Sequence, residues 1–152
     1  RVGGATEAEL GERKDRVDDA LSATQAAIDE GILPGGGVAL VRAASKLDTT
    51  DESAGVSAGK TIIKNACYSP LRQIVRNAGG SASVVLEKVL EESCQSHGYN
   101  AATEEYGDML EMGIIDPTKV VKSAFENASS AASMMLTVGC AMVEDNEVDK
   151  LN

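Results

Sequence analysis

Apolar residues recur at helical spacing through most of the chain, and this pattern predicts a mostly α-helical fold. The longest example runs from Thr6 to about Glu30, where one mainly apolar stripe lies on an otherwise charged helix: Leu10, Val17, Leu21, Thr24 and Ile28. Thr6 with Glu9 three residues on predicts a capping box at its start, and Gly31 predicts its end. Shorter stripes predict helices at about residues 38–47, 58–67, 69–78 and 83–92. The predicted core positions of these helices are Ile62, Ile63, Ala66, Cys67, Leu71, Ile74, Val75, Val85, Leu86, Val89 and Leu90.

The last predicted helix follows the helix-start signal Asp116-Pro117 and runs to about Thr137. Its apolar stripe is rich in alanine and consists of Val120, Val121, Ala124, Ala128, Ala131, Ala132, Met135 and Leu136. Small side chains allow two helices to approach each other closely. We therefore expect it to be a central core helix.

Shorter segments have strand and turn character. Two apolar or aromatic runs flank a polar turn between Tyr99 and Gly107 and predict a β-hairpin. Residues 1–5 and 140–143 are each predicted to be a short edge strand, which is a liability unless a neighbouring strand pairs with it. Residues 32–37 are interpreted as a turn in which backbone can approach another group closely.

Composition restricts the possible partners. The 152 residues carry a net charge of -10 at pH 7, so neither nucleic acid nor an anionic membrane surface is an expected partner. No run approaches the roughly 18 apolar residues of a membrane span. Cys67, Cys94 and Cys140 are scattered and His97 is the only histidine, so we expect neither a disulfide framework nor a metal site.

Three features allow both a structural and a functional interpretation. Gly35-Gly36-Gly37 before a helix can present backbone to a phosphate, or it can form a tight turn only. Asp18 and Asp19 lie on a helix, where acidic residues most often form a solvated face. Asp116 before Pro117 is a sound helix cap in its own right.

A possible phosphate-binding loop at Gly55 to Thr61 does not meet the requirements of that motif. Only three residues separate Gly55 from Gly59, whereas the loop requires four, and no apolar strand precedes it. We interpret the segment as a solvated helix start, and a free-standing P-loop enzyme is not expected.

Several short sequence segments, spread along the chain, favour the functional interpretations. The chain contains Asp-Asp-Ala-Leu-Ser-Ala-Thr from Asp18, Glu-Gly-Ile-Leu-Pro-Gly-Gly-Gly-Val-Ala-Leu from Glu30 and Pro-Leu-Arg-Gln-Ile-Val from Pro70. It continues with Tyr-Asn-Ala-Ala-Thr-Glu-Glu-Tyr-Gly from Tyr99 and Gly-Ile-Ile-Asp-Pro from Gly113. In this order the blocks closely resemble the group I chaperonins, the ring-forming protein-folding machines, over nearly the whole chain.

The resemblance implies two domains and an incomplete subunit. Residues 1–29 correspond to the C-terminal limb of the intermediate domain, and residues 30–152 to the C-terminal half of the equatorial, ATP-binding domain. A family subunit is several times longer, and its remainder carries the phosphate-binding loop, the metal-binding aspartate and the apical domain. We therefore expect this chain alone neither to hydrolyse ATP nor to fold clients. ATP or ADP, with Mg²⁺ and K⁺, is expected to bind tightly only in the whole subunit.

The resemblance also implies roles for two residues near the phosphates. Asp19 matches the acidic residue before Ala-Leu that positions the water attacking the γ-phosphate, a task suited to a carboxylate. Gly36 matches a backbone contact to the nucleotide.

The segments from Tyr99 and from Gly113 correspond to the nucleoside side of the family's nucleotide pocket. These positions are Asn100, Ala101 and Ala102 around the adenine, Ile114 against the base and Asp116 on the ribose hydroxyls. The small alanines leave room for a flat ring, and the asparagine amide can pair with the edge of the ring.

By the same resemblance the partners are identical subunits in heptameric rings, with the co-chaperonin and unfolded proteins bound through the apical domain. Gly-Ile-Leu-Pro-Gly-Gly-Gly is more similar to mitochondrial members, so the mitochondrial matrix is the expected location, with bacterial cytoplasm or another organelle as the alternative. A rival hypothesis is a self-associating helical interaction or structural module without nucleotide chemistry.

Overall fold

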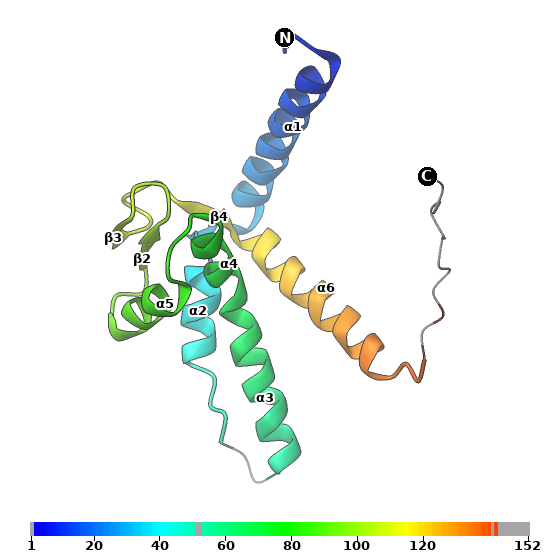
Figure 1. The fold of residues 1–152 in the computed structure, drawn as a ribbon, viewed down its shortest axis with the longest axis vertical. Coiled ribbons are helices and arrows are strands. Elements are labelled where there is room, and N and C mark those ends of the chain that lie inside the picture. Colours follow the sequence, from blue (N-terminus) through cyan, green and yellow to red (C-terminus); the bar gives the residue numbers. More distant parts are fainter. Residues whose placement is uncertain (1, 51–52, 141, 143–152) are drawn as a thin grey trace, which may run out of the picture. The chain divides into compact units, whose positions relative to one another are not determined.

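The structure is a computed structural model that describes residues 2–50, 53–140 and 142. Within these ranges the chain forms six helices and four short strands (Figure 1). In order they are α1 (Glu7–Glu30), β1 (Ile32–Pro34), α2 (Val38–Ser45), α3 (Ala54–Cys67), α4 (Ser69–Asn77), α5 (Ala82–Glu91), β2 (His97–Asn100), β3 (Glu105–Asp108), β4 (Ile115–Pro117) and α6 (Thr118–Leu136). The prediction of a mostly helical fold is confirmed.

The chain divides into two units, residues 1–120 and 121–152, and the first of them contains the core. Its buried residues come from α2, α4, α5, the end of α3 and the turn after β3: Val38, Val41, Ala44, Cys67, Tyr68, Leu71, Val75, Ala82, Val85, Leu86, Val89 and Met109. Six of the predicted core positions are among them: Cys67, Leu71, Val75, Val85, Leu86 and Val89. Ile74 and Leu90 are not, because each lies at the edge of its helix stripe and remains partly exposed.

The strands form two separate antiparallel pairs. β2 and β3 form the predicted hairpin, with Tyr99 opposite Tyr106. β1 pairs with β4, with Leu33 opposite Asp116. The interpretation of residues 32–34 as part of a turn is therefore wrong. Local spacing could not identify this strand, because its hydrogen-bonding partner is far away in the sequence.

The ends of α1 follow the predicted signals. The Thr6 hydroxyl accepts a hydrogen bond from the backbone N–H of Glu9 at 3.2 Å, and the Glu9 carboxylate accepts one from the backbone N–H of Ala5 at 2.9 Å. This is a capping box whose second bond is shifted by one residue. At the other end, Gly31 has a φ of 84°, which favours glycine.

Three helices with predicted packing faces bury one residue or none. α1 and α6 bury no residue, and α3 buries only Cys67. Ile62 and Ile63, predicted to face inward, are 68% and 43% exposed. The prediction that the last helix is a central core helix is wrong for the described chain. Helical spacing identifies a face that can be buried, but burial also requires a second surface.

The predicted terminal strands are not formed where the structure describes them. Val2–Gly4 and Cys140 are not in strands, and the four described strands pair only with one another. Ala141 and Val143, which belong to the second predicted strand, lie outside the described residues.

Candidate functional site

The glycine turn between β1 and α2 requires glycine at two positions. Gly36 and Gly37 have φ angles of 67° and 80°, which L side chains rarely adopt. A Cβ atom on Gly37 would lie 2.7 Å from the backbone nitrogen of Leu71. A Cβ atom on Gly36 would lie 3.0 Å from Met109 Cε and 3.8 Å from the backbone oxygen of Tyr99. The turn therefore lies directly against α4 and against the hairpin region.

Backbone hydrogen bonds connect the same turn to the segment that follows the hairpin. Gly35 donates its N–H to the backbone oxygen of Ile114 at 2.9 Å, and Ile114 donates to the backbone oxygen of Met109 at 2.8 Å. Two residues further on, Asp116 lies opposite Leu33 in the β1–β4 pair. The structure thus brings Ile114 and Asp116 beside the glycine turn, although they are remote in sequence.

The loop after β2 is held by its first residue. Asn100 Oδ1 accepts a hydrogen bond from the backbone N–H of Ala102 at 3.0 Å, as in an Asx turn. Glu104 has a φ of 60° and completes the reversal into β3. Ala101 is half-buried and Ala102 is exposed. Because Oδ1 is used in the turn, the Nδ2 group of Asn100 is the side-chain donor that a ligand could use.

Asp116 does not cap α6, contrary to the structural interpretation of Asp-Pro. The first N–H of α6, on Thr118, donates instead to the backbone oxygen of Gly31 at 3.0 Å. Asp116 is half-buried, and burial raises the pKa of its carboxyl above the ordinary value of 3.8. The described residues provide no hydrogen bond to this carboxylate, which leaves it available as an acceptor.

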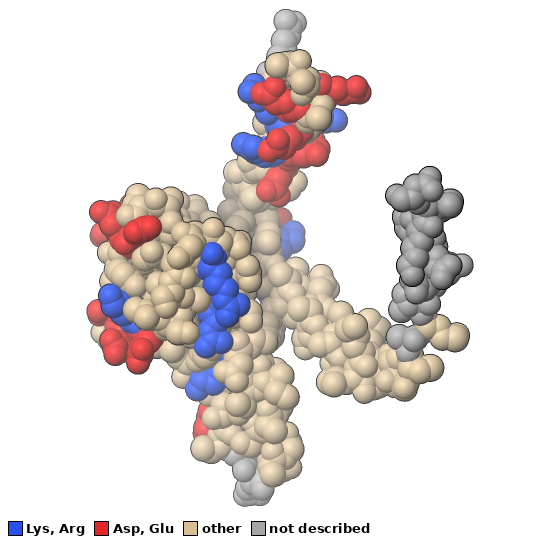
Figure 2. Space-filling view, in the orientation of Figure 1, with Lys and Arg blue, Asp and Glu red and all other residues tan. Residues whose placement is uncertain are grey.

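Asp19 does not lie beside the other predicted site residues. It lies on the exposed surface of α1, twelve residues before Gly31, which is about 18 Å along a helix axis. Asp18 is exposed as well. In Figure 2, acidic and basic side chains are interspersed over the N-terminal half of the helix that Figure 1 labels α1.

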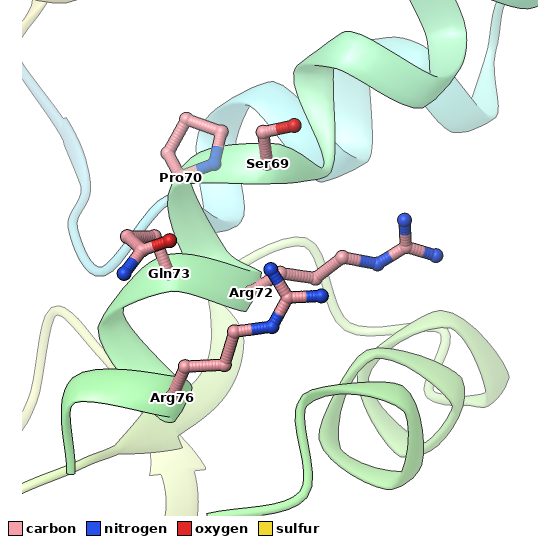
Figure 3. A pocket seen from close by; sticks show the side chains of 5 residues that line it. All are labelled: Ser69, Pro70, Arg72, Gln73 and Arg76. Carbon is pink, nitrogen blue, oxygen red and sulfur yellow. The ribbon is translucent and has the colours of Figure 1, made fainter.

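A separate hollow of about 470 Å³ lies on α4 (Figure 3), and its lining is formed by Ser69, Pro70, Arg72, Gln73 and Arg76. The Arg72 guanidinium carbon lies 5.9 Å from the centre of the Tyr68 ring, within reach of a cation–π interaction. The hollow contains none of the predicted site residues. Its sequence signal was the spacing of four between Arg72 and Arg76, which places both on one face of a helix.

Within the described ranges, no group of three His, Cys, Asp or Glu side chains could hold a metal ion. The three cysteines are free; Cys67 is buried, and burial raises the pKa of its thiol. None of the described helices combines the length and apolar character needed to cross a membrane.

Comparison with known proteins identifies the family. Residues 1–146 match the sequence model of the TCP-1/cpn60 chaperonin family, and the chain therefore belongs to this family. Its structure is similar to the crystal structure of a group III chaperonin in the open state, with a TM-score of 0.80 and 27% sequence identity. The match covers 93% of this chain but only 30% of the other, so the chain spans less than a third of that chaperonin's length.

Proposed function

We propose that the chain is the C-terminal part of a group I chaperonin subunit and supplies the adenine and ribose side of its ATP pocket. The observation that carries the proposal is the meeting of the glycine turn, Ile114 and Asp116 at one place beside the strand that ends at Asn100. The group I assignment rests on the sequence blocks from Glu30 and from Tyr99.

Each of these groups has a chemical use toward a nucleotide. Gly36 is only half-buried, so a ligand can reach its backbone. Ile114 is a partly buried apolar residue that suits the face of a purine ring, and Asn100 Nδ2 can donate to the edge of that ring. The unpaired Asp116 carboxylate can accept hydrogen bonds from ribose hydroxyls, which would offset the cost of its burial.

The phosphate chemistry is proposed to need the rest of the subunit. Phosphoryl transfer requires a metal ion and a phosphate cradle as well as an oriented water. In the whole subunit, Asp19 would orient that water, after α1 brings it to the γ-phosphate. Mg²⁺ and K⁺ would bind together with ATP at groups that the other part of the subunit provides.

The whole protein is proposed to act as an ATP-dependent folding chaperone. Its subunits would form heptameric rings, and the co-chaperonin and unfolded proteins would bind to the apical domain. The proposed location is the mitochondrial matrix, with bacterial cytoplasm or another organelle as the alternative.

A titration of the chain with adenosine and with ADP, followed by amide NMR, tests the proposed pocket. Because the phosphate cradle is absent, we expect both ligands to bind weakly and similarly. Both should shift the amides of Gly36, Asn100, Ala102 and Ile114. If adenosine caused no shifts and ADP shifted only the amides of Arg72 and Arg76, the basic hollow on α4 would instead hold the phosphates, and the assignment would be overturned.

The exposed helix faces favour a second candidate function, a self-associating helical module. Leu21 and Ile28 of α1 are 69% and 74% exposed, and Leu136 of α6 is 87% exposed. Apolar surface of this extent favours association. Sedimentation equilibrium distinguishes the two functions: a stable oligomer that does not respond to adenosine would support the module.

A further inference from the structure

The buried guanidinium group of Arg42 links two segments that are far apart in the sequence. Arg42 lies one turn into α2 and is only 7% exposed. Its Nη1 donates to the backbone oxygen of Glu92 at 2.7 Å, and its Nη2 donates to the backbone oxygen of His97 at 3.2 Å. Arg42 thus fixes α2 to the segment that leaves α5 and enters β2.

These two elements each carry one part of the candidate site. α2 begins at Val38, directly after the glycine turn, and β2 ends at Asn100. One helical turn separates Val38 from Arg42, and β2 runs without interruption from His97 to Asn100. The Arg42 side chain is therefore a direct polar link between the glycine turn and the Asn100 loop.

Core packing alone does not explain an arginine at this position. A buried charge is costly unless it is paired and hydrogen-bonded, and none of the described carboxylates pairs with Arg42. Its Nε atom is buried without a hydrogen-bond partner. An apolar side chain of similar length would fill the space without these costs, so the two carbonyl bonds are the reason for a guanidinium.

The carbonyl of Glu92 is a suitable acceptor for a cation. Glu92 follows the last residue of α5, where backbone oxygens lack partners within the helix and positive charge is favoured. A planar guanidinium can reach both this oxygen and that of His97 with separate N–H groups. A lysine ammonium has no such fixed fork, and we expect it to hold one carbonyl at most.

We propose that Arg42 is a positioning residue, which sets the separation between the glycine turn and the Asn100 loop. Its purpose rests on the proposed nucleotide pocket, whereas the geometric effect can be measured without nucleotide. Arg42 itself is not expected to contact the ligand, because its N–H groups are directed to backbone oxygens.

The experiment compares Arg42→Met, Arg42→Lys and Val41→Ala in the 152-residue chain, using amide hydrogen exchange and chemical shifts measured by NMR. Val41 is fully buried beside Arg42, so Val41→Ala weakens the core and leaves both carbonyl bonds intact. We expect Arg42→Met to accelerate exchange in β2 and β3 by about tenfold relative to α4, because charge-assisted hydrogen bonds are lost. The Asn100 and Ala102 amides should shift as well.

The remaining variants separate positioning from general stability. Arg42→Lys should accelerate hydrogen exchange of the β2 and β3 amides less than Arg42→Met does. If Arg42→Met does not fold, Arg42→Lys is compared with the wild-type chain instead. Equal acceleration in α4 and in the hairpin, or the same response to Val41→Ala, would overturn the proposal. If adenosine does not shift the wild-type amides, only the proposed nucleotide pocket is rejected. The positioning role of Arg42 is still tested, because the exchange rates of the β2 and β3 amides are measured without ligand.

Discussion

The core around α2, α4 and α5 and the long helices α1 and α6 are built from similar amphipathic patterns, but they differ in burial. Leu71 and Val89 in the core are 2% and 0% exposed, whereas Leu21 and Leu136 in the long helices are 69% and 87% exposed. All four lie on a predicted apolar stripe. The difference teaches that a stripe shows which face of a helix can be buried, whereas a second surface decides whether it is.

The largest expected effect comes from truncating a core leucine. Leu71→Ala should lower the free energy of unfolding by about 2–5 kcal/mol, because it leaves a cavity among tightly packed residues. Leu21→Ala on α1 is the matched control and should change it by no more than about 0.5 kcal/mol. Urea denaturation followed by circular dichroism measures both. Equal losses would mean that α1 is packed in solution, and the comparison would fail.

A smaller effect is expected in the glycine turn that the core supports. Gly37→Ala combines a positive φ with a Cβ atom 2.7 Å from the Leu71 nitrogen, so backbone must move. Gly113 also has a positive φ but open space around it, so Gly113→Ala should cost only about 1–2 kcal/mol for the conformation. Thermal melts should show a greater loss for Gly37→Ala. The reverse order would contradict the close approach of the turn to α4.

The Asp116 carboxyl should make stability depend on pH. Burial raises its folded pKa above 3.8, so the folded state binds the proton more tightly, and stability falls as pH rises from 3.8 through that folded pKa. Asp116→Asn removes the buried charge and should therefore raise the melting temperature at pH 7, with a difference that shrinks below pH 3.8. Asp19→Asn on exposed α1 serves as the control, since it has no burial penalty to remove. A lower melting temperature for Asp116→Asn at pH 7 would argue that the carboxylate has a stabilising partner.

The smallest effect is expected where α1 meets the start of α6. Lys119 Nζ lies 3.0 Å from Asp29 Oδ2, and both side chains are about half exposed. Exposed ion pairs contribute little and are screened by salt, so Lys119→Gln should hardly change the melting temperature, and less still in 0.5 M salt. A large, salt-independent loss would show that this junction is more buried in solution than on the surface described here.

Sequence reasoning succeeded where the determinants are local. The Thr6 cap, the glycines after β1 and the Tyr99–Tyr106 hairpin are each specified by neighbouring residues. The β1–β4 pair was missed because its two strands lie far apart along the chain. The burial of α6 was mispredicted, since none of its residues is buried. For the site, the family blocks pointed to Ile114 and Asp116, which do lie beside the glycine turn. The link through Arg42 was not predicted, since Arg42 lay on a predicted helix with no local signal for its carbonyl partners.

The central claim is that this chain supplies only the adenine and ribose side of the ATP pocket. Its most direct test is calorimetric titration of the chain with ATP in the presence of Mg²⁺ and K⁺, followed by an assay of phosphate release from the same sample. A whole subunit that contains these residues is the positive control and should bind ATP and release phosphate. For the chain alone we predict no tight, saturable heat and no phosphate. Sustained phosphate release that is lost in Asp19→Ala would contradict the division of the pocket between two parts of the subunit.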